Sequence, residues 1–298
     1  MKVRAHPERM SAQKSQRMSS PAGTVRAIYR KLSRAWGPQH WWPAETPFEV
    51  IAGAILTQNT AWTNVERALT NLRAAGLLSV EGIRGVSIDQ LETLVRPSGY
   101  FRQKAQRLKN FVAFLDQKHG GSPAAMLAGG TEQLREELLA LNGIGHETAD
   151  SILLYAGHHP IFVVDAYTRR VLGRHDVVEA DPTYDAIRTL VEGALDAETP
   201  LIGPFEPWRD QQAPTVHPPS PMSTAPRAPL SQVYNEMHGL MVQVGKHYCL
   251  KQVPRCDACP LGAMLARPVQ IRSPLLVKRQ QALKTKRKAS KKPEKSRL

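Results

Sequence analysis

Cysteine and long apolar runs are both scarce in this sequence, and each shortage excludes a class of protein. The 298 residues contain three cysteines, too few for the disulfide framework of a small secreted domain. The longest apolar stretches, such as 152–164, run for about a dozen residues, whereas a membrane-spanning helix needs roughly 20. No apolar segment follows the basic residues 1–18, so we expect no secretory signal. These absences predict a soluble, cytoplasmic protein that is not bound to a membrane.

The central part of the chain lacks net charge, although the whole sequence carries +14. Residues 1–18 contribute +4 and residues 272–298 contribute +10, whereas residues 19–271 hold 24 basic and 24 acidic side chains. Both charged ends lack apolar periodicity, and we expect them to be disordered. The second end is either a solubility tail or an arm that seeks DNA phosphates. The positive charge favours a nucleic-acid partner.

Strand patterns are also scarce, because apolar residues recur at helical spacing through most of the chain. Residues 203–230 hold eight of the 23 prolines and are expected to form an extended loop between helices. The pattern therefore predicts an all-α protein. We expect its helices at 25–36, 48–58, 63–76, 88–95, 101–118, 131–141, 147–157, 167–172, 183–195 and 231–248.

A glycine-containing turn lies between two of these helices. Gly143 and Gly145 would permit positive φ angles and a close backbone approach. Their N–H groups are suited to face a phosphate, although an ordinary helix–turn–helix connection has the same pattern. The run Val163-Val164-Asp165 then places a carboxylate just before a helix, where Asp165 is either an N-cap or a functional acid.

The segment LNGIG at 141–145, followed by VVD at 163–165, resembles the helix-hairpin-helix (HhH-GPD) DNA glycosylases of the endonuclease III superfamily. The resemblance covers about residues 25–267. It implies a two-lobed fold, with a six-helix barrel lobe at 48–157 and a second lobe made of 19–47 and 158–267. It also implies that the hairpin grips the DNA backbone and that Asp165 is essential for catalysis. The implied hairpin residues are Asn142, Gly143, Ile144 and Gly145.

Glu147 stands where bifunctional members of this family carry a lysine that forms a Schiff base. Glutamate cannot form an imine, so the resemblance implies a monofunctional glycosylase that uses water as nucleophile. His146 and Glu147 are alternatively only helix N-terminal residues. Lys104 or Lys246 would have to approach in space to replace the lysine.

The segment HWWPAETPFEVIAGAILTQNTAW at 40–62 looks like the 3-methyladenine DNA glycosylase branch of the superfamily. By this resemblance Trp41, Trp42 and Trp62 form a base pocket, where aromatic faces suit a cationic alkylated purine. Core packing is the alternative for all three.

Four further residues are expected at the DNA. Gln58 falls where the family fills the gap left by the flipped base, and Tyr100 falls at its intercalating wedge. Arg102 and Lys104 belong to a basic cluster that we expect to contact the backbone. Gln58 and Tyr100 are alternatively ordinary buried contacts.

Cys249, Cys256 and Cys259 reproduce three ligands of the iron–sulfur loop of endonuclease III, with Leu265 at the place of the fourth. A [4Fe–4S] cluster normally takes four thiolates. The sequence leaves open a four-iron or three-iron cluster, a Cys3His zinc site and a loop that has lost its metal.

The leading hypothesis is a monofunctional glycosylase that excises alkylated purines from damaged double-stranded DNA as a nucleoid-associated monomer. One rival is an endonuclease III-type glycosylase with weak lyase activity on oxidised or mismatched pyrimidines. The other is a DNA-binding protein of this fold without catalysis.

Overall fold

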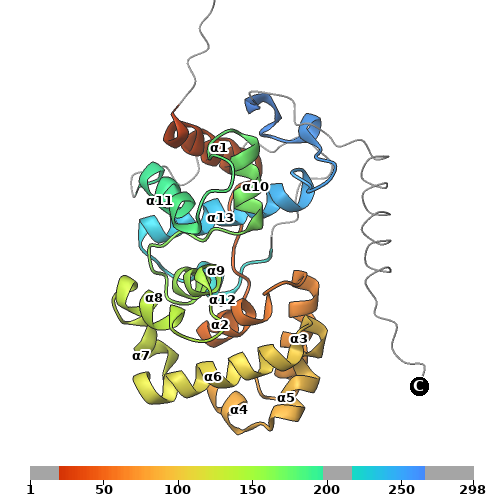
Figure 1. Ribbon diagram of the computed structural model, residues 1–298, viewed down its shortest axis with the longest axis vertical. Coiled ribbons are helices and arrows are strands. Elements are labelled where there is room, and N and C mark those ends of the chain that lie inside the picture. Colours follow the sequence, from red (N-terminus) through yellow and green to blue (C-terminus); the bar gives the residue numbers. More distant parts are fainter. Residues whose placement is uncertain (1–19, 197–216, 266–298) are drawn as a thin grey trace, which may run out of the picture.

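Helices build the part of the chain that the computed structural model describes, residues 20–196 and 217–265. No residue in those ranges lies in a β-strand, which confirms the all-α prediction. The helices form two lobes, one above the other in Figure 1. The predicted charged tails and residues 203–216 of the proline-rich segment lie outside the described residues.

The lower lobe is organised around α2 (Pro47–Leu56), in which every residue from Phe48 to Leu56 is buried. A helix that is apolar on all sides must be surrounded by other helices. Its start is fixed by Thr46, whose hydroxyl accepts a hydrogen bond from the Glu49 N–H at 3.2 Å. Helices α3 (Trp62–Ala74), α6 (Phe101–His119), α7 (Pro123–Leu127) and α9 (His146–Ser151) contact α2. The lobe also contains α4 (Val80–Gly85), α5 (Ile88–Val95) and α8 (Thr131–Leu139).

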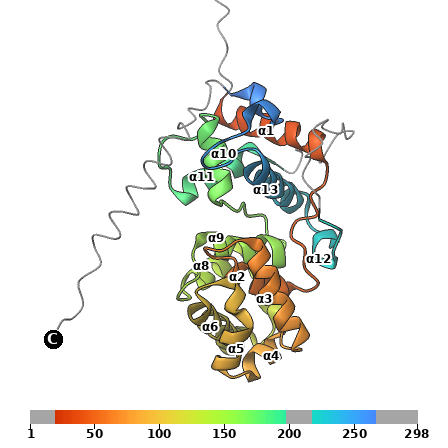
Figure 2. The same cartoon turned by 90° about the vertical axis from the view of Figure 1, so that its right-hand side faces the viewer.

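The upper lobe is organised around a second buried helix, α13 (Pro229–His247), which contacts α1 (Pro21–Trp36) and α10 (Ala166–Arg174). Helix α11 (Tyr184–Ala194) packs on α1. The chain thus starts in the upper lobe, builds the lower lobe and returns, as the two views in Figures 1 and 2 show. This arrangement confirms the predicted two-lobed architecture.

Several short segments differ from the sequence prediction, among them α4 and α7, which it did not include. The proline-rich stretch is not a loop throughout, since it contains α12 (Pro221–Thr224) and the start of α13 at Pro229. Proline is tolerated in a first helical turn because the N–H it lacks has no partner there. Helix α9 does not continue regularly, because residues Ile152–Ala156 form a π-helical turn.

Within residues 20–196 and 217–265, no helix combines the length and the apolar composition that crossing a membrane would need.

Candidate active site

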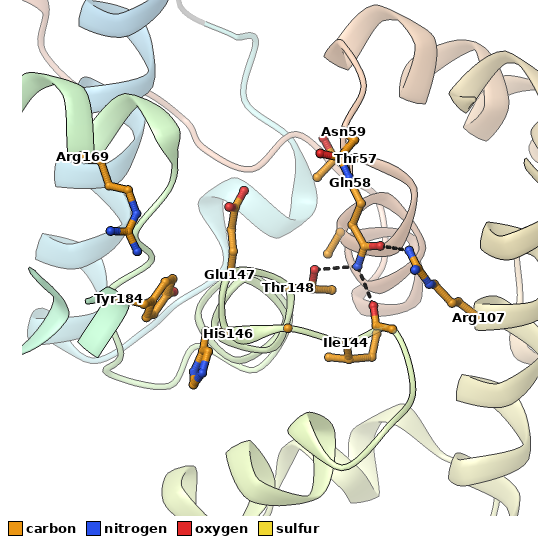
Figure 3. A pocket seen from close by; sticks show the side chains of 13 residues that line it. Thr57, Gln58, Asn59, Arg107, Ile144, His146, Glu147, Thr148, Arg169 and Tyr184 are labelled. Carbon is orange, nitrogen blue, oxygen red and sulfur yellow. Dashed lines mark hydrogen bonds between the residues drawn. The ribbon is translucent and has the colours of Figure 1, made fainter. Parts of the chain in front are cut away.

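A cleft of about 680 Å³ lies where the two lobes meet. The end of α2 and the hairpin that leads into α9 form one wall. Helices α10 and α11 contribute Arg169 and Tyr184 from the other lobe (Figure 3). The lining residues are Ala54, Thr57, Gln58, Asn59, Arg107, Gly143, Ile144, Gly145, His146, Glu147, Thr148, Arg169 and Tyr184.

Asp165 is the N-cap of α10, and its carboxylate is buried. Its Oδ1 accepts a hydrogen bond from the Thr168 N–H at 2.7 Å, and Oδ2 lies 3.7 Å from His238 Nε2. His238 Nδ1 is in turn hydrogen-bonded to the Tyr155 hydroxyl. Burial lowers the pKa of His238, although Asp165 acts in the opposite direction, so this imidazole is neutral near pH 7. His238 therefore brings no full positive charge to the Asp165 carboxyl group.

Glu147 lines the cleft from the first turn of α9. Part of its surface meets solvent, yet the crowded cleft walls and then the Asp165 charge raise its pKa to about 7. Arg169, which approaches from α10 in Figure 3, acts in the opposite direction. Near neutral pH the cleft thus holds a carboxyl group that is close to half-protonated.

His146 is held at the edge of the cleft by structural contacts. Its Nδ1 accepts a hydrogen bond from Arg135 Nη2 at 3.0 Å, and its ring stacks on Tyr184 at 5.2 Å. Arg135 also forms a buried ion pair with Asp150, 2.7 Å between Nε and Oδ1. His146 therefore helps to join α8, α9 and α11.

The hairpin at 142–145 needs only one glycine for its backbone conformation. Gly143 has φ +87°, whereas Gly145 has φ −101°, so the expectation that both require positive φ is wrong for Gly145. Ile144 is buried, and its N–H donates to the Leu141 carbonyl. Asn142 is exposed. Ile144 therefore anchors the hairpin, and it also lines the cleft.

Gln58 lies directly against this hairpin. Its Nε2 donates to the Gly143 carbonyl and to Thr148 Oγ1, both at 2.9 Å. Its Oε1 accepts a hydrogen bond from Arg107 Nη1. Two predicted DNA-binding elements, 85 residues apart in the sequence, are therefore in direct contact.

The three remaining predicted DNA contacts lie in different surroundings. Tyr100 is 67% exposed at the start of α6, with φ +46°, a position that leaves the predicted wedge role open. Arg102 is exposed and lies 3.6 Å from the Glu92 carboxylate.

The expectation that Lys104 contacts DNA is wrong, because its side chain is only 1% exposed. Its Nζ donates to the carbonyls of Leu56 and Ser98 at 2.8 and 2.6 Å.

The predicted base-pocket tryptophans form a packed cluster next to Asp165, and none of them lines the 680 Å³ cleft. Trp41 and Trp42 are each 5% exposed, and Trp62 stands perpendicular to Trp42 at 4.8 Å. Tyr155, which bonds His238, also packs on Trp42 at 5.2 Å. The pocket role therefore stays a prediction, and it requires this cluster to open.

Lys246 is one of the two lysines that the sequence left as candidates to approach the site, and it does lie in this region. Its Nζ lies 5.5 Å from the centre of the Trp41 ring, a cation–π arrangement in which the ring face attracts the ammonium group. Burial lowers its pKa, although Glu66 and Asp165 act in the opposite direction. Tyr155 and His238 were missed, since no local motif marks a contact made across the fold.

Comparison with known proteins identifies the family. The profile described as "HhH-GPD superfamily base excision DNA repair protein" matches residues 52–196. The protein named "Putative DNA repair glycosylase MJ1434" of Methanocaldococcus jannaschii is 40% identical over 235 residues, which cover 78% of this chain and 92% of that one. The chain belongs to the HhH-GPD superfamily. It is a base excision repair DNA glycosylase by family.

Other members of the HhH-GPD superfamily agree with this assignment. Endonuclease III of Thermotoga maritima is 26% identical over 216 residues, or 72% of this chain and 79% of that one. The crystal structure of the H. pylori 3-methyladenine DNA glycosylase MagIII bound to 1,N6-ethenoadenine matches with TM-score 0.57 and 27% identity, covering 76% of this chain and 98% of that one. A trapped endonuclease III–DNA covalent intermediate matches with TM-score 0.61 and 20% identity over 84% of this chain and 97% of that one, which shows a shared fold.

The cysteine loop of this HhH-GPD protein does not fit the iron–sulfur cluster that its superfamily suggests. Cys249, Cys256 and Cys259 line a cavity of about 20 Å³, which has room for about one water molecule. Leu265 lines it at the place of the fourth ligand. Cys249 Sγ accepts a hydrogen bond from Arg174 at 3.1 Å. In the part of the chain that the structure describes, no three His, Cys, Asp or Glu side chains have metal-binding geometry.

Proposed function

We propose that this chain is a monofunctional DNA N-glycosylase that hydrolyses the N-glycosidic bond of flipped alkylated purines, with Asp165 as the catalytic carboxylate. The observation that carries the proposal is Glu147, which lines the cleft and which, by the resemblance, stands where bifunctional members of the family carry the Schiff-base lysine. A carboxyl group cannot attack the sugar to form an imine, so the nucleophile has to be water. The proposed partner is damaged double-stranded DNA, bound by a monomer.

The chemistry that we assign to Asp165 follows from its surroundings. Breaking an N-glycosidic bond develops positive charge on the sugar, as in glycoside hydrolysis. A fixed carboxylate stabilises that charge and can orient or deprotonate the attacking water. The Thr168 N–H and the start of α10 hold the Asp165 carboxylate in place. Glu147, close to half-protonated near neutral pH, is available to hold the water beside it.

The aromatic cluster supports an alkylated purine as the substrate class. The face of Trp41 already accommodates a cation, the ammonium of Lys246. A positively charged purine would stack favourably on the same surface and is also a good leaving group. A base entering here would have to displace Lys246, as well as part the Trp41–Trp42 contact. Similarity to a 3-methyladenine glycosylase over 76% of the chain agrees with this substrate class.

Lys246 favours one second candidate function, a glycosylase that also cleaves the strand. An amine with a lowered pKa is a better nucleophile, and Asp165 acts electrostatically on this one. Lys104 does not qualify, because two backbone carbonyls already bind its ammonium group. The two functions differ in whether a covalent enzyme–DNA adduct forms.

A substrate panel distinguishes these functions. Purified protein is incubated with duplexes that contain 3-methyladenine, 1,N6-ethenoadenine, thymine glycol, uracil or an abasic site, and half of each sample then receives hot alkali. We expect strand breaks at the alkylated purines only after alkali. Breaks without alkali, together with an adduct trapped by borohydride that Lys246→Gln abolishes, would overturn the monofunctional assignment. Tight binding without turnover on every duplex would indicate a non-catalytic protein.

Two substitutions of Asp165 test its assignment. Asp165→Asn keeps an oxygen for the Thr168 N–H but removes the charge, so we expect excision to fall by about 10²–10⁴-fold with little change in stability. Asp165→Ala also removes the cap and should cost about 1 kcal/mol of unfolding free energy in addition. Single-turnover excision and thermal unfolding measure the two effects. Excision by Asp165→Asn at the wild-type rate would show that another group is the catalytic carboxylate.

A further inference from the structure

The contacts of Gln58 with the hairpin and with Arg107 hold its side chain in one orientation, which the family resemblance does not predict. All three hydrogen bonds of the Gln58 amide go to protein groups: the Gly143 carbonyl, the Thr148 hydroxyl and the Arg107 guanidinium (Figure 3). An amide whose donors and acceptor are all engaged is held in one orientation. The side chain predicted to fill the gap in DNA is therefore preorganised by its neighbours.

Arg107 also packs against the hairpin itself. A Cβ placed on Gly143 would lie 2.8 Å from Arg107 Cδ and closer still to Nε. Gly143 thus meets two demands at once, a positive φ angle and the absence of a side chain where the arginine passes. The stem of Arg107 and the hairpin backbone form one packed unit.

The charge of Arg107 is not neutralised by a protein carboxylate. In residues 20–196 and 217–265 no aspartate or glutamate forms an ion pair with it, and its one hydrogen bond uses Nη1. The side chain is partly exposed at the wall of the 680 Å³ cleft. A guanidinium with spare N–H donors in a cleft is suited to a phosphate, which it binds through two N–H groups at once.

We infer that Arg107 is a DNA phosphate ligand that also positions Gln58, so that it couples a backbone contact to the residue at the gap. The phosphate binds the N–H groups that Gln58 leaves available, while Nη1 keeps the amide in place. The two contacts of Arg107 together fix the distance between the bound phosphate and the position of the extruded base. The inference rests on the proposed binding of DNA in this cleft and does not depend on which base is excised.

Binding measurements test Arg107 separately from catalysis. The full-length protein is titrated with an undamaged duplex and with the same duplex carrying a tetrahydrofuran abasic analogue, at several salt concentrations. Arg107→Gln should lower the slope of log affinity against log salt by about 1 on both duplexes. Lys118→Gln, an equal charge change at the exposed far end of α6, should leave the slope unchanged. An Arg107→Gln slope equal to that of the wild type would overturn the inference.

The positioning role is tested by combining Arg107→Gln with Gln58→Ala. Each single variant should reduce the preference for the abasic duplex about fivefold. The double variant should lose no more of this preference than Gln58→Ala alone, because Arg107 acts through Gln58. A double variant whose loss of preference equals the product of the two single losses would contradict the coupling between Arg107 and Gln58.

Arg107→Lys provides a second check, since it keeps the charge but cannot hold the amide and a phosphate with one planar group. The Arg107→Lys variant should retain the wild-type salt slope and lose the preference for the abasic duplex. A lowered melting temperature of Arg107→Gln with an unchanged salt slope would mark Arg107 as merely structural. If no base in the panel is excised but the slope falls, the glycosylase assignment fails and the Arg107 assignment stands.

Discussion

Two carboxyl groups of the proposed site have different surroundings, since Glu147 lines the cleft whereas Asp165 is buried. Asp165 accepts a hydrogen bond from the Thr168 N–H at the start of α10. Glu147 has crowded walls and the Asp165 charge to oppose its ionisation. A pair of carboxyl groups in different surroundings is a common arrangement for acid–base chemistry at a sugar carbon.

Replacement of Glu147 by glutamine should change the pH dependence of stability. The pKa of Glu147 rises from 4.5 to about 7 on folding, so between these values the folded protein binds more protons than the unfolded chain. The contribution of Glu147 is therefore fully present below its unfolded pKa and is lost as the pH rises through its folded value. Relative to the wild type, Glu147→Gln should melt at the same temperature near about pH 4 and at a higher one near about pH 8.

Thermal unfolding over this pH range measures the difference. Glu136→Gln, at an exposed position of α8, is the matched control and should give a flat difference. A Glu147→Gln difference that does not grow with pH would show that the glutamate is ionised without cost in the folded protein.

Single residues of the site were predictable only where a local pattern marks them. Asp165 and Glu147 follow from the hairpin and the VVD run, because their roles are tied to fixed spacing in one continuous segment. No local pattern singles out Arg107 or His238. Arg107 lies in α6, which is rich in basic residues, and His238 lies in the buried helix α13. Their contacts exist only after distant helices have packed.

At the scale of elements, Lys104 shows how a basic residue can serve a helix end. Its stem passes through the core of the lower lobe from α6, and its ammonium group binds the carbonyl of Leu56, the last residue of α2. Carbonyls at a helix end lack intrahelical partners, so a buried helix needs such a donor. Burial, with a smaller effect of Arg107, lowers the pKa of Lys104 to about 8.

Lys104→Met tests this structural role against the DNA contact that the sequence suggested. Methionine matches the stem but leaves the carbonyls of Leu56 and Ser98 without their donor, which should cost about 1–3 kcal/mol of unfolding free energy. The salt slope of DNA binding should not change, because the group is buried. Denaturant unfolding and salt titration measure the two quantities, with Lys118→Met as the exposed control. A stable variant with a reduced slope would restore the original DNA-binding assignment.

The long helices were predictable because their apolar periodicity extends over several turns. Helices α4, α7 and α12 have six, five and four residues, too few for a period of 3.6 to be recognised. Their starts do carry a signal, since each follows a serine whose side chain accepts a backbone N–H. These capping serines would have located the three short helices that apolar periodicity did not reveal.

At the scale of the whole molecule, the two lobes follow from two largely buried helices, α2 and α13, each of which needs its own shell of surrounding helices. The cleft was not predictable in detail, because its lining comes from segments between 54 and 184 that meet only in the fold. The charge distribution raises a separate question, since the region that contains both lobes carries no net charge. Local groups such as Arg107 must therefore provide specific contacts with DNA, while the charged ends can contribute only nonspecific electrostatic attraction.

Removal of residues 272–298 should weaken DNA binding without slowing excision of bound substrate. This segment carries eleven basic residues against one acidic residue, whereas residues 19–271 are balanced. Each phosphate contact contributes about 0.9 to the salt slope, so loss of the segment should flatten the slope by several units. A full-length variant with glutamine at the eleven basic positions separates charge from length and should behave like the truncation. Salt titration and single-turnover excision measure the two effects. A truncated protein with the wild-type slope would place the electrostatic contacts in the balanced region instead.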